Sequence, residues 1–252
     1  MTGTVLSALE FEVLWEAERL PKPHPALRVP SPGRTHTERR ELVGQAWESL
    51  AERGLARGSR ASDGMVDQLT LLANPKVAID TWVWTDREIK SLAVSTGRQA
   101  LLAVVDNGEV WLIPARDTSL PESAVSVAGE LGAGVGHSVS VPHDVLRAAD
   151  KRAKGDPKAL VTTLADRGVE LWAAQELAGM LVGMSVRGQF GVERLGRDGT
   201  MRRANRVIAF YDTDAGRYLL QLGDSNGRDW ATVAPADNHL LAGRIWELLD
   251  EV

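Results

Sequence analysis

The sequence predicts an α+β fold in which two similar halves each contribute helices and part of an antiparallel sheet. Three observations lead to this prediction. The predicted strands follow one another in runs instead of alternating with helices, one hairpin-like stretch occurs twice, and a glycine-rich segment divides the chain near its middle. We therefore expect a single domain over residues 1–252, with a first repeat at 1–128, a junction at 129–137 and a second repeat at 138–252.

The duplicated stretch is RQALLAVVDNGEVW in the first half and RYLLQLGDSNGRDW in the second. The two agree at five positions, which include an Asn-Gly pair at 107–108 and again at 226–227. Asn-Gly tolerates positive φ angles, so both pairs predict tight hairpin turns. Each turn precedes a tryptophan, Trp111 or Trp230, which we interpret as a packing residue that recurs because the unit recurs.

The first half is predicted to begin with a short strand at 5–9 and a helix at 11–20. The connector PKPHPALRVPSPG follows, and its five prolines favour an extended chain. The remaining predictions for this half are helices at 37–55 and 62–73, strands at 77–84, 89–95, 99–105 and 109–114, and a helix at 121–131.

The second half is predicted to repeat this order. Apolar and polar residues alternate in the strand at 184–195, which indicates one buried and one wet face. Pro235 is expected in the first turn of the final helix, where its missing N–H costs little. Joining two such halves edge to edge would bury sheet edges that are otherwise exposed. The other predicted elements are a strand at 138–141, helices at 144–153, 156–167 and 170–180, and strands at 204–212, 217–222 and 228–233.

Composition argues against several classes of function. The net charge is −5, whereas proteins that bind the phosphate backbone of nucleic acids usually carry a basic excess. The chain has no cysteine, which excludes disulfides, thiolate metal sites and cysteine nucleophiles. The first residues lack the basic region of a secretory signal, and the apolar run at 100–105 is too short to cross a bilayer. We expect a cytoplasmic protein without membrane insertion.

The sequence contains no recognisable catalytic motif. Its five histidines form no metal-binding motif, and the glycine-rich junction follows a predicted helix rather than the strand that a phosphate-binding loop requires. We therefore expect no catalytic residue, no metal and no cofactor. One enzymatic alternative stays open, a hydrolase that uses Asp212, Asp214 and His239, although turn formation also accounts for both aspartates.

Trp82 and Trp84 lie two residues apart in the predicted strand VAIDTWVWT and therefore share one face of it. Val77, Ile79 and Val83 occupy the opposite face, so both faces carry large apolar groups. One face must pack under helices. The tryptophan face is either an exposed interaction patch or is covered by helices from the other half.

With these segments in view, the chain resembles the EspG family, the secretion-associated chaperones of the ESX (type VII) systems of actinobacteria. The resemblance runs nearly end to end, through FEVLW, HPALRVPSPGRT and LAERGL in the first half and RGQFGV, DTDAGRY and VAPAD in the second. It implies two quasi-symmetric halves with a central antiparallel sheet between two helical bundles. It also implies a non-enzymatic role: binding a PE–PPE heterodimer in the cytosol at the helical tip of the PPE subunit and keeping it soluble for export.

The resemblance further implies which residues contact the partner. They lie on the sheet, on the loop between its second and third strands, and on the second bundle: Trp82, Trp84, Asp86, Arg87, Leu177, Met180, Gln189, Phe190 and Arg194. The loop at 84–90 is shorter than is common in mycobacterial members, so a different helical-hairpin substrate stays open as the partner. One copy is expected in the complex, with self-association left open. An adaptor for another secretion component is a further hypothesis.

Overall fold

The structure, a computed structural model, describes residues 3–33, 35–225 and 227–252. Within these residues, eleven strands form one antiparallel sheet, which confirms the predicted α+β class. A separate short hairpin joins β2 (Ala56–Arg57) to β3 (Arg60–Ala61). The strands of the large sheet are β1 (Thr4–Ser7), β4 (Val77–Trp84), β5 (Glu88–Ser95), β6 (Ala100–Asp106), β7 (Glu109–Ala115), β8 (Val139–Pro142), β9 (Val186–Leu195), β10 (Met201–Arg203), β11 (Ile208–Thr213), β12 (Gly216–Ser225) and β13 (Arg228–Pro235).

The strand order follows the same scheme from both edges of the sheet. It runs β1-β7-β6-β5-β4 in the first half and continues β9-β11-β12-β13-β8 in the second, with β10 paired to β9. In each half the first strand lies at the outer edge, and the strand that begins the main run lies at the centre. The halves meet where β4 pairs with β9, from Val77 opposite Arg194 to Trp84 opposite Arg187. This order supports the proposal that the chain is built from two repeats.

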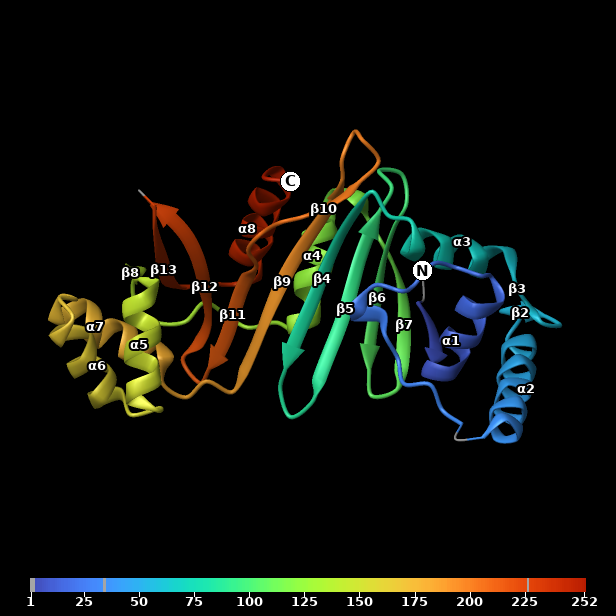
Figure 1. The fold of residues 1–252 in the computed structure, drawn as a ribbon, viewed down its shortest axis with the longest axis horizontal. Coiled ribbons are helices and arrows are strands. Elements are labelled where there is room, and N and C mark those ends of the chain that lie inside the picture. The colour runs from blue at the N-terminus through green and yellow to red at the C-terminus, as the bar shows by residue number, and fades with distance from the viewer. Residues whose placement is uncertain (1–2, 34, 226) are drawn as a thin grey trace.

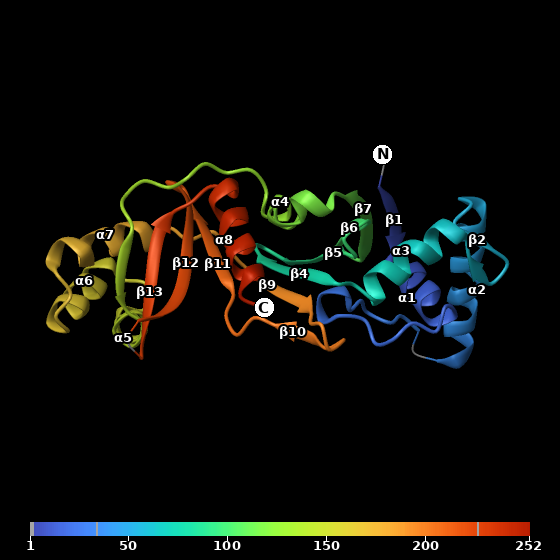
Figure 2. The same ribbon diagram turned by 90° about the horizontal axis from the view of Figure 1, so that it is seen from above.

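The helices form three groups around the sheet (Figures 1 and 2). One bundle lies at the end that carries β1, a second lies at the end that carries β8, and a pair lies between them on one face of the sheet. We call the face that carries this pair the back face and the opposite one the front face. The bundles are α1 (Ala8–Ala17), α2 (His36–Glu52) and α3 (Asp63–Ala73), and α5 (His143–Ala153), α6 (Pro157–Asp166) and α7 (Leu171–Leu181); the pair is α4 (Leu120–Val125) and α8 (Asn238–Asp250).

Each helical group has its own hydrophobic core. The first bundle packs on Leu92, Val94 and Leu101 of the front face, and the second packs on Tyr211 and Tyr218. The central core lies beneath α4 and α8 and draws on both halves of the chain. It includes Ile79, Val83, Phe190, Val192 and Phe210. One core thus contains residues from both sides of the β4–β9 pairing, which supports the prediction of a single domain. No helix among the described residues is long and apolar enough to cross a membrane.

Polar side chains set the helix starts. Ser7 accepts from the amide of Glu10, and the Glu10 carboxylate accepts from the amide of Ser7, which makes a capping box at α1. Asp156 and Asp237 accept from amides in the first turns of α6 and α8.

The prediction that Pro235 lies in the first turn of the final helix is wrong, because α8 begins only at Asn238. Pro235 ends β13, where a strand end tolerates its missing N–H, and Asp237 caps α8 instead.

The duplicated hairpin is confirmed in the first half. Asn107 and Gly108 both have positive φ, 47° and 81°, as a tight turn between paired strands requires. The matching Asn226 lies outside the described residues. Trp111 is not a core residue: it shares the back face with α4, but α4 lies over β4, β5 and β6, and the indole is 43% exposed.

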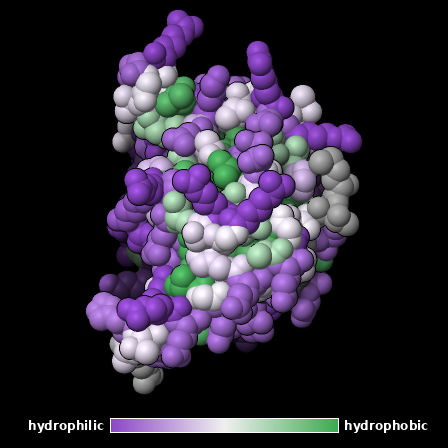
Figure 3. Space-filling model, turned by 90° about the vertical axis from the view of Figure 1, so that its right-hand side faces the viewer, coloured by the Kyte–Doolittle hydropathy of each residue, from purple (hydrophilic) through white to green (hydrophobic). Residues whose placement is uncertain are grey.

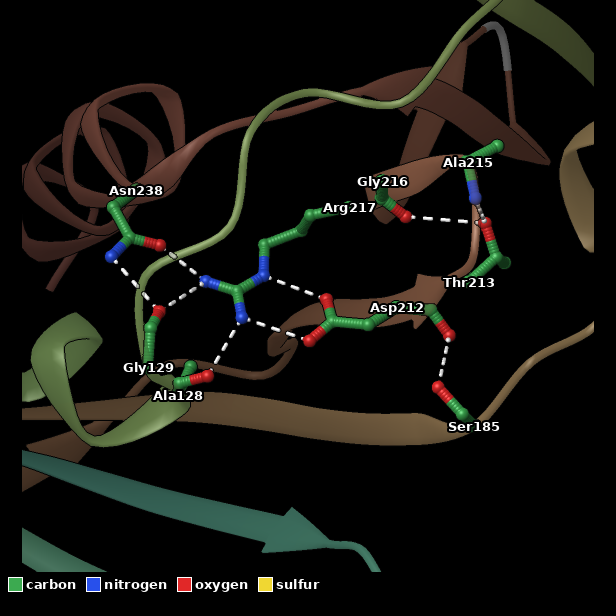
Figure 4. A network of polar contacts seen from close by, with 9 residues as sticks. All are labelled: Ala128, Gly129, Ser185, Asp212, Thr213, Ala215, Gly216, Arg217 and Asn238. Carbon is green, nitrogen blue, oxygen red and sulfur yellow. Dashed lines mark hydrogen bonds and ion pairs between the residues drawn. The ribbon is translucent and has the colours of Figure 1, made fainter.

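A buried arginine joins the glycine-rich junction to the second half (Figure 4). Arg217 of β12 is 1% exposed, and its guanidinium forms a bidentate ion pair with Asp212 of β11 at 2.7 and 2.9 Å. It also donates to the carbonyls of Ala128 and Gly129 and to the side chain of Asn238 at the start of α8. All five N–H bonds of the guanidinium are thereby used.

The junction lies directly on β12. The Arg217 amide donates to the Gly132 carbonyl, and the Arg217 carbonyl accepts from the Gly134 amide. A side chain at Gly134 would place its Cβ 2.2 Å from the Tyr218 ring, so only glycine permits this approach. The predicted linker at 129–137 therefore packs against β12 and is held there by hydrogen bonds.

We predict that Arg217→Met lowers the free energy of unfolding by about 3–5 kcal/mol, because it leaves the Asp212 carboxylate buried without its cation. Urea unfolding measures the change. Arg98→Met is the matched control, since Arg98 aligns with Arg217 in the duplicated stretch but is exposed. Equal losses in the two variants would contradict the role of Arg217.

Candidate functional site

The centre of the front face lies between the two bundles, and none of the helices α1–α8 crosses in front of β4 or β9 in Figure 1, although the short 3-10 helix η1 (Pro25–Leu27) contacts β4 and β5. Trp82 and Trp84 project there from β4, opposite Gln189 and Arg187 of β9. We call these four residues the central strip. Because β4 belongs to the first half and β9 to the second, each half supplies one side of the strip.

The two tryptophans stack on each other, with ring centroids 6.4 Å apart and planes 22° from parallel. The lysine nitrogen of Lys90 lies 5.8 Å from the Trp82 ring, and the guanidinium of Arg187 lies 5.9 Å from the Trp84 ring. Both indoles are half-buried, and Trp82 also packs against the first core. The prediction left open whether helices cover this face, and the tryptophans remain partly exposed.

Each indole N–H donates a hydrogen bond to a carboxylate. Trp82 donates to Asp80 at 3.0 Å, and Trp84 donates to Glu88 at 3.1 Å. These bonds fix the polar edge of each ring, so the aromatic faces are presented in a defined orientation. The strip is a rigid aromatic patch flanked by two cations.

The turn after Trp84 holds the predicted contacts Asp86 and Arg87. Asp86 is exposed, whereas Arg87 forms a bidentate ion pair with Asp106 at 2.7 and 3.0 Å. The pair fastens the β4–β5 turn to the end of β6. The Arg87 guanidinium holds the pKa of the Asp106 carboxyl below its ordinary value of 3.8.

Four other predicted contacts do not lie on the strip. Leu177 and Met180 are buried inside the second bundle, and Phe190 is buried beneath α4 and α8. Arg194 points to the back face, where it lies 3.8 Å from Asp250 of α8. For Phe190 and Arg194 the reason is that neighbouring positions of a strand point to opposite faces of the sheet. Of the three predicted contacts on β9, only Gln189 points to the front face.

Exposed apolar side chains of the second bundle lie elsewhere on α7 and on the segment that leads to β9. Trp172 is 62% exposed, and Leu171, Val182 and Met184 are exposed as well. Apart from Gln175 and Glu176, the helix sequence LWAAQELAGML is apolar, so its apolar residues extend beyond the side that faces the core. In contrast, the end of the molecule that carries the first bundle is mostly hydrophilic with scattered apolar atoms (Figure 3).

Two polar groupings could suggest other chemistry. His24, Asp80 and Glu193 bring ligand-type atoms within 4.8 Å of one another, but the Arg203 guanidinium lies 2.6 Å from Asp80 and 2.8 Å from Glu193. The positive charge that a metal ion would supply is thus already present. The hydrolase alternative would need Asp212 as a catalytic residue. Both of its carboxylate oxygens accept from the buried Arg217, so this carboxylate has a structural role.

Comparison with known proteins agrees with the fold. The sequence profile of the EspG family matches residues 7–247. Among solved structures, the chain is similar to EspG5, a type VII secretion system chaperone of Mycobacterium tuberculosis. That structure contains EspG5 in complex with the PE25–PPE41 dimer. The TM-score is 0.78 at 15% identity, and the match covers 99% of this chain and 96% of that one. No curated protein matches the chain.

We predict that the Asp106 carboxyl titrates below 3.8 in the folded chain and returns toward that value in Arg87→Met. Because the folded pKa is depressed, the ion pair contributes its full stability above about pH 4 and loses it as the pH falls through the folded pKa. NMR titration of the carboxyl measures both. The exposed Arg197→Met is the control, and an unchanged pKa in Arg87→Met would contradict the prediction.

Proposed function

The chain belongs to the EspG family, and on that premise we propose that it is a chaperone for a type VII secretion substrate of PE–PPE type. The proposed contact surface is the central strip, extended by the exposed turn residue Asp86 and by Val182 and Met184 between α7 and β9. The proposed partner is a helical hairpin with an apolar tip. The chain would act in the cytoplasm, before export.

The observation that carries this proposal is the stacked, partly exposed tryptophan pair at the centre of the front face of the sheet. Tryptophan is enriched among the residues that dominate binding energy, and rigid aromatic groups lose little conformational entropy on binding. Phe11, Phe190 and Phe210 lie in the cores, and the exposed Trp111 and Trp172 lie on other elements without a second indole beside them on the same element. Two half-buried indoles on one strand therefore indicate a surface that a partner completes.

The fold comparison supports the kind of partner. EspG5, whose fold this chain shares, is described in complex with a PE–PPE dimer. An apolar helical tip would aggregate if it stayed exposed, so a chaperone must cover it and later release it. A standard-size interface with a small aromatic centre meets both needs, since such interfaces range widely in affinity.

We predict that Trp84→Ala weakens binding of the cognate PE–PPE pair about 30-fold or more, because it removes a central aromatic anchor. The measurement is calorimetric titration of the purified chain with a co-purified PE–PPE pair encoded in the same genome. Trp84 is half-buried on the sheet surface, so the variant is expected to remain folded.

Trp111→Ala is the control, since Trp111 is another tryptophan of the sheet but lies on the back face and is more exposed than Trp84. Its affinity should stay near that of the unaltered chain. Equal weakening by both variants would contradict the central strip as the contact surface. Failure of every PE–PPE pair of the genome to form a complex would overturn the proposed function, and capture of secretion machinery alone would favour the adaptor hypothesis.

A further inference from the structure

Asp80 lies on the same face of β4 as Trp82 and supports its indole. Its carboxylate belongs to a residue only 2% exposed, and Oδ1 accepts the indole N–H at 3.0 Å. A partly exposed tryptophan on a strand has several rotamers available, and this bond selects one of them. A buried carboxylate is stable in that place only if its charge is compensated.

Arg203 supplies the compensation. It comes from β10, the short strand outside the main path of the sheet. Its Nη1 lies 2.6 Å from Oδ2 of Asp80, and its Nη2 lies 3.2 Å from Oδ1. The same Nη1 donates to Glu193 at 2.8 Å, and Glu193 also lies 3.5 Å from Nε2 of His24. A planar guanidinium bound to two carboxylates has little freedom to move, so Asp80 is held in position.

Gly191 provides the space for this contact. It lies directly opposite Asp80 on β9. A Cβ at Gly191 would stand 2.2 Å from Nη2 of Arg203 and 2.7 Å from Oδ2 of Asp80. A glycine within a strand often marks the close approach of another group, and here that group is the guanidinium. A side chain at position 191 would therefore displace the Arg203 guanidinium from Asp80.

We propose that Arg203 is a positioning residue of the central strip: it holds Asp80, and Asp80 holds the Trp82 indole in the orientation that stacks on Trp84. The inference rests on the proposed function for its effect on binding. Arg203 itself acts through Asp80 and Trp82. Its contribution is pre-organisation, because a strip fixed before binding loses less entropy when the partner arrives.

The first measurement needs no partner. In ¹⁵N NMR spectra, Trp82→Phe identifies the Trp82 indole N–H signal. Arg203→Met should shift that signal and speed its exchange with solvent, because Asp80 no longer holds the bond in place. Arg202→Met is the matched control: Arg202 also lies on β10 but pairs with exposed Asp198. An unchanged Trp82 signal in Arg203→Met would overturn the inference.

The second measurement separates positioning from a merely structural role. Arg203→Met should weaken binding of the PE–PPE pair about tenfold in the unaltered chain, but little further when Trp82→Phe is already present. Equal weakening in both backgrounds would overturn the inference. Complete absence of binding by the unaltered chain would instead overturn the proposed function, while the indole measurement still decides the positioning role.

A rescue variant guards against misfolding. Asp80→Asn keeps an oxygen that accepts the indole N–H but carries no charge that needs a cation. Asp80→Asn combined with Arg203→Met should therefore stay folded and recover much of the slow indole exchange. If Arg203→Met alone unfolds, recovery of the Trp82 signal in the combined variant supports the inference, and a folded combined variant with a free indole overturns it.

Discussion

The buried ion pair between Arg217 and Asp212 is the interaction on which the arrangement of the second half depends. A charge removed from water is costly unless every hydrogen bond is satisfied, and Arg217 satisfies all of its own with groups from β11, the junction and α8. Few other placements of these segments would meet that demand. The pair therefore fixes where the junction runs and where α8 begins, and α8 in turn covers the back of the sheet centre.

The two halves share a strand order but differ in which charged and apolar residues they bury and expose. Arg217 is buried at its position, whereas the aligned Arg98 is exposed and forms no ion pair with any residue that the structure describes. The first bundle has a charged outer helix, and the second has an apolar one. The two halves thus share a topology, differ in the exposed residues of their bundles, and each contribute one side of the central strip.

The sequence was sufficient for the fold class, because the predicted strands follow one another in runs and the Asn-Gly turn at 107–108 sets a hairpin. Alternation also placed Trp82 and Trp84 on one face. It could not place Leu177 and Met180, since most residues of α7 are apolar and the sequence therefore gives little indication of which side is buried. Nor could it find Arg203, which meets Asp80 across 123 residues with no local signal in either segment.

The central pairing of β4 with β9 also has a consequence for the timing of synthesis. One strand of the strip lies in the first third of the chain, and the other begins only at Val186. A ribosome-bound chain that has emerged through β4 but not β9 carries one side of the strip, without the opposing Arg187 and Gln189. The complete strip can therefore form only after β9 has been synthesised and has paired with β4.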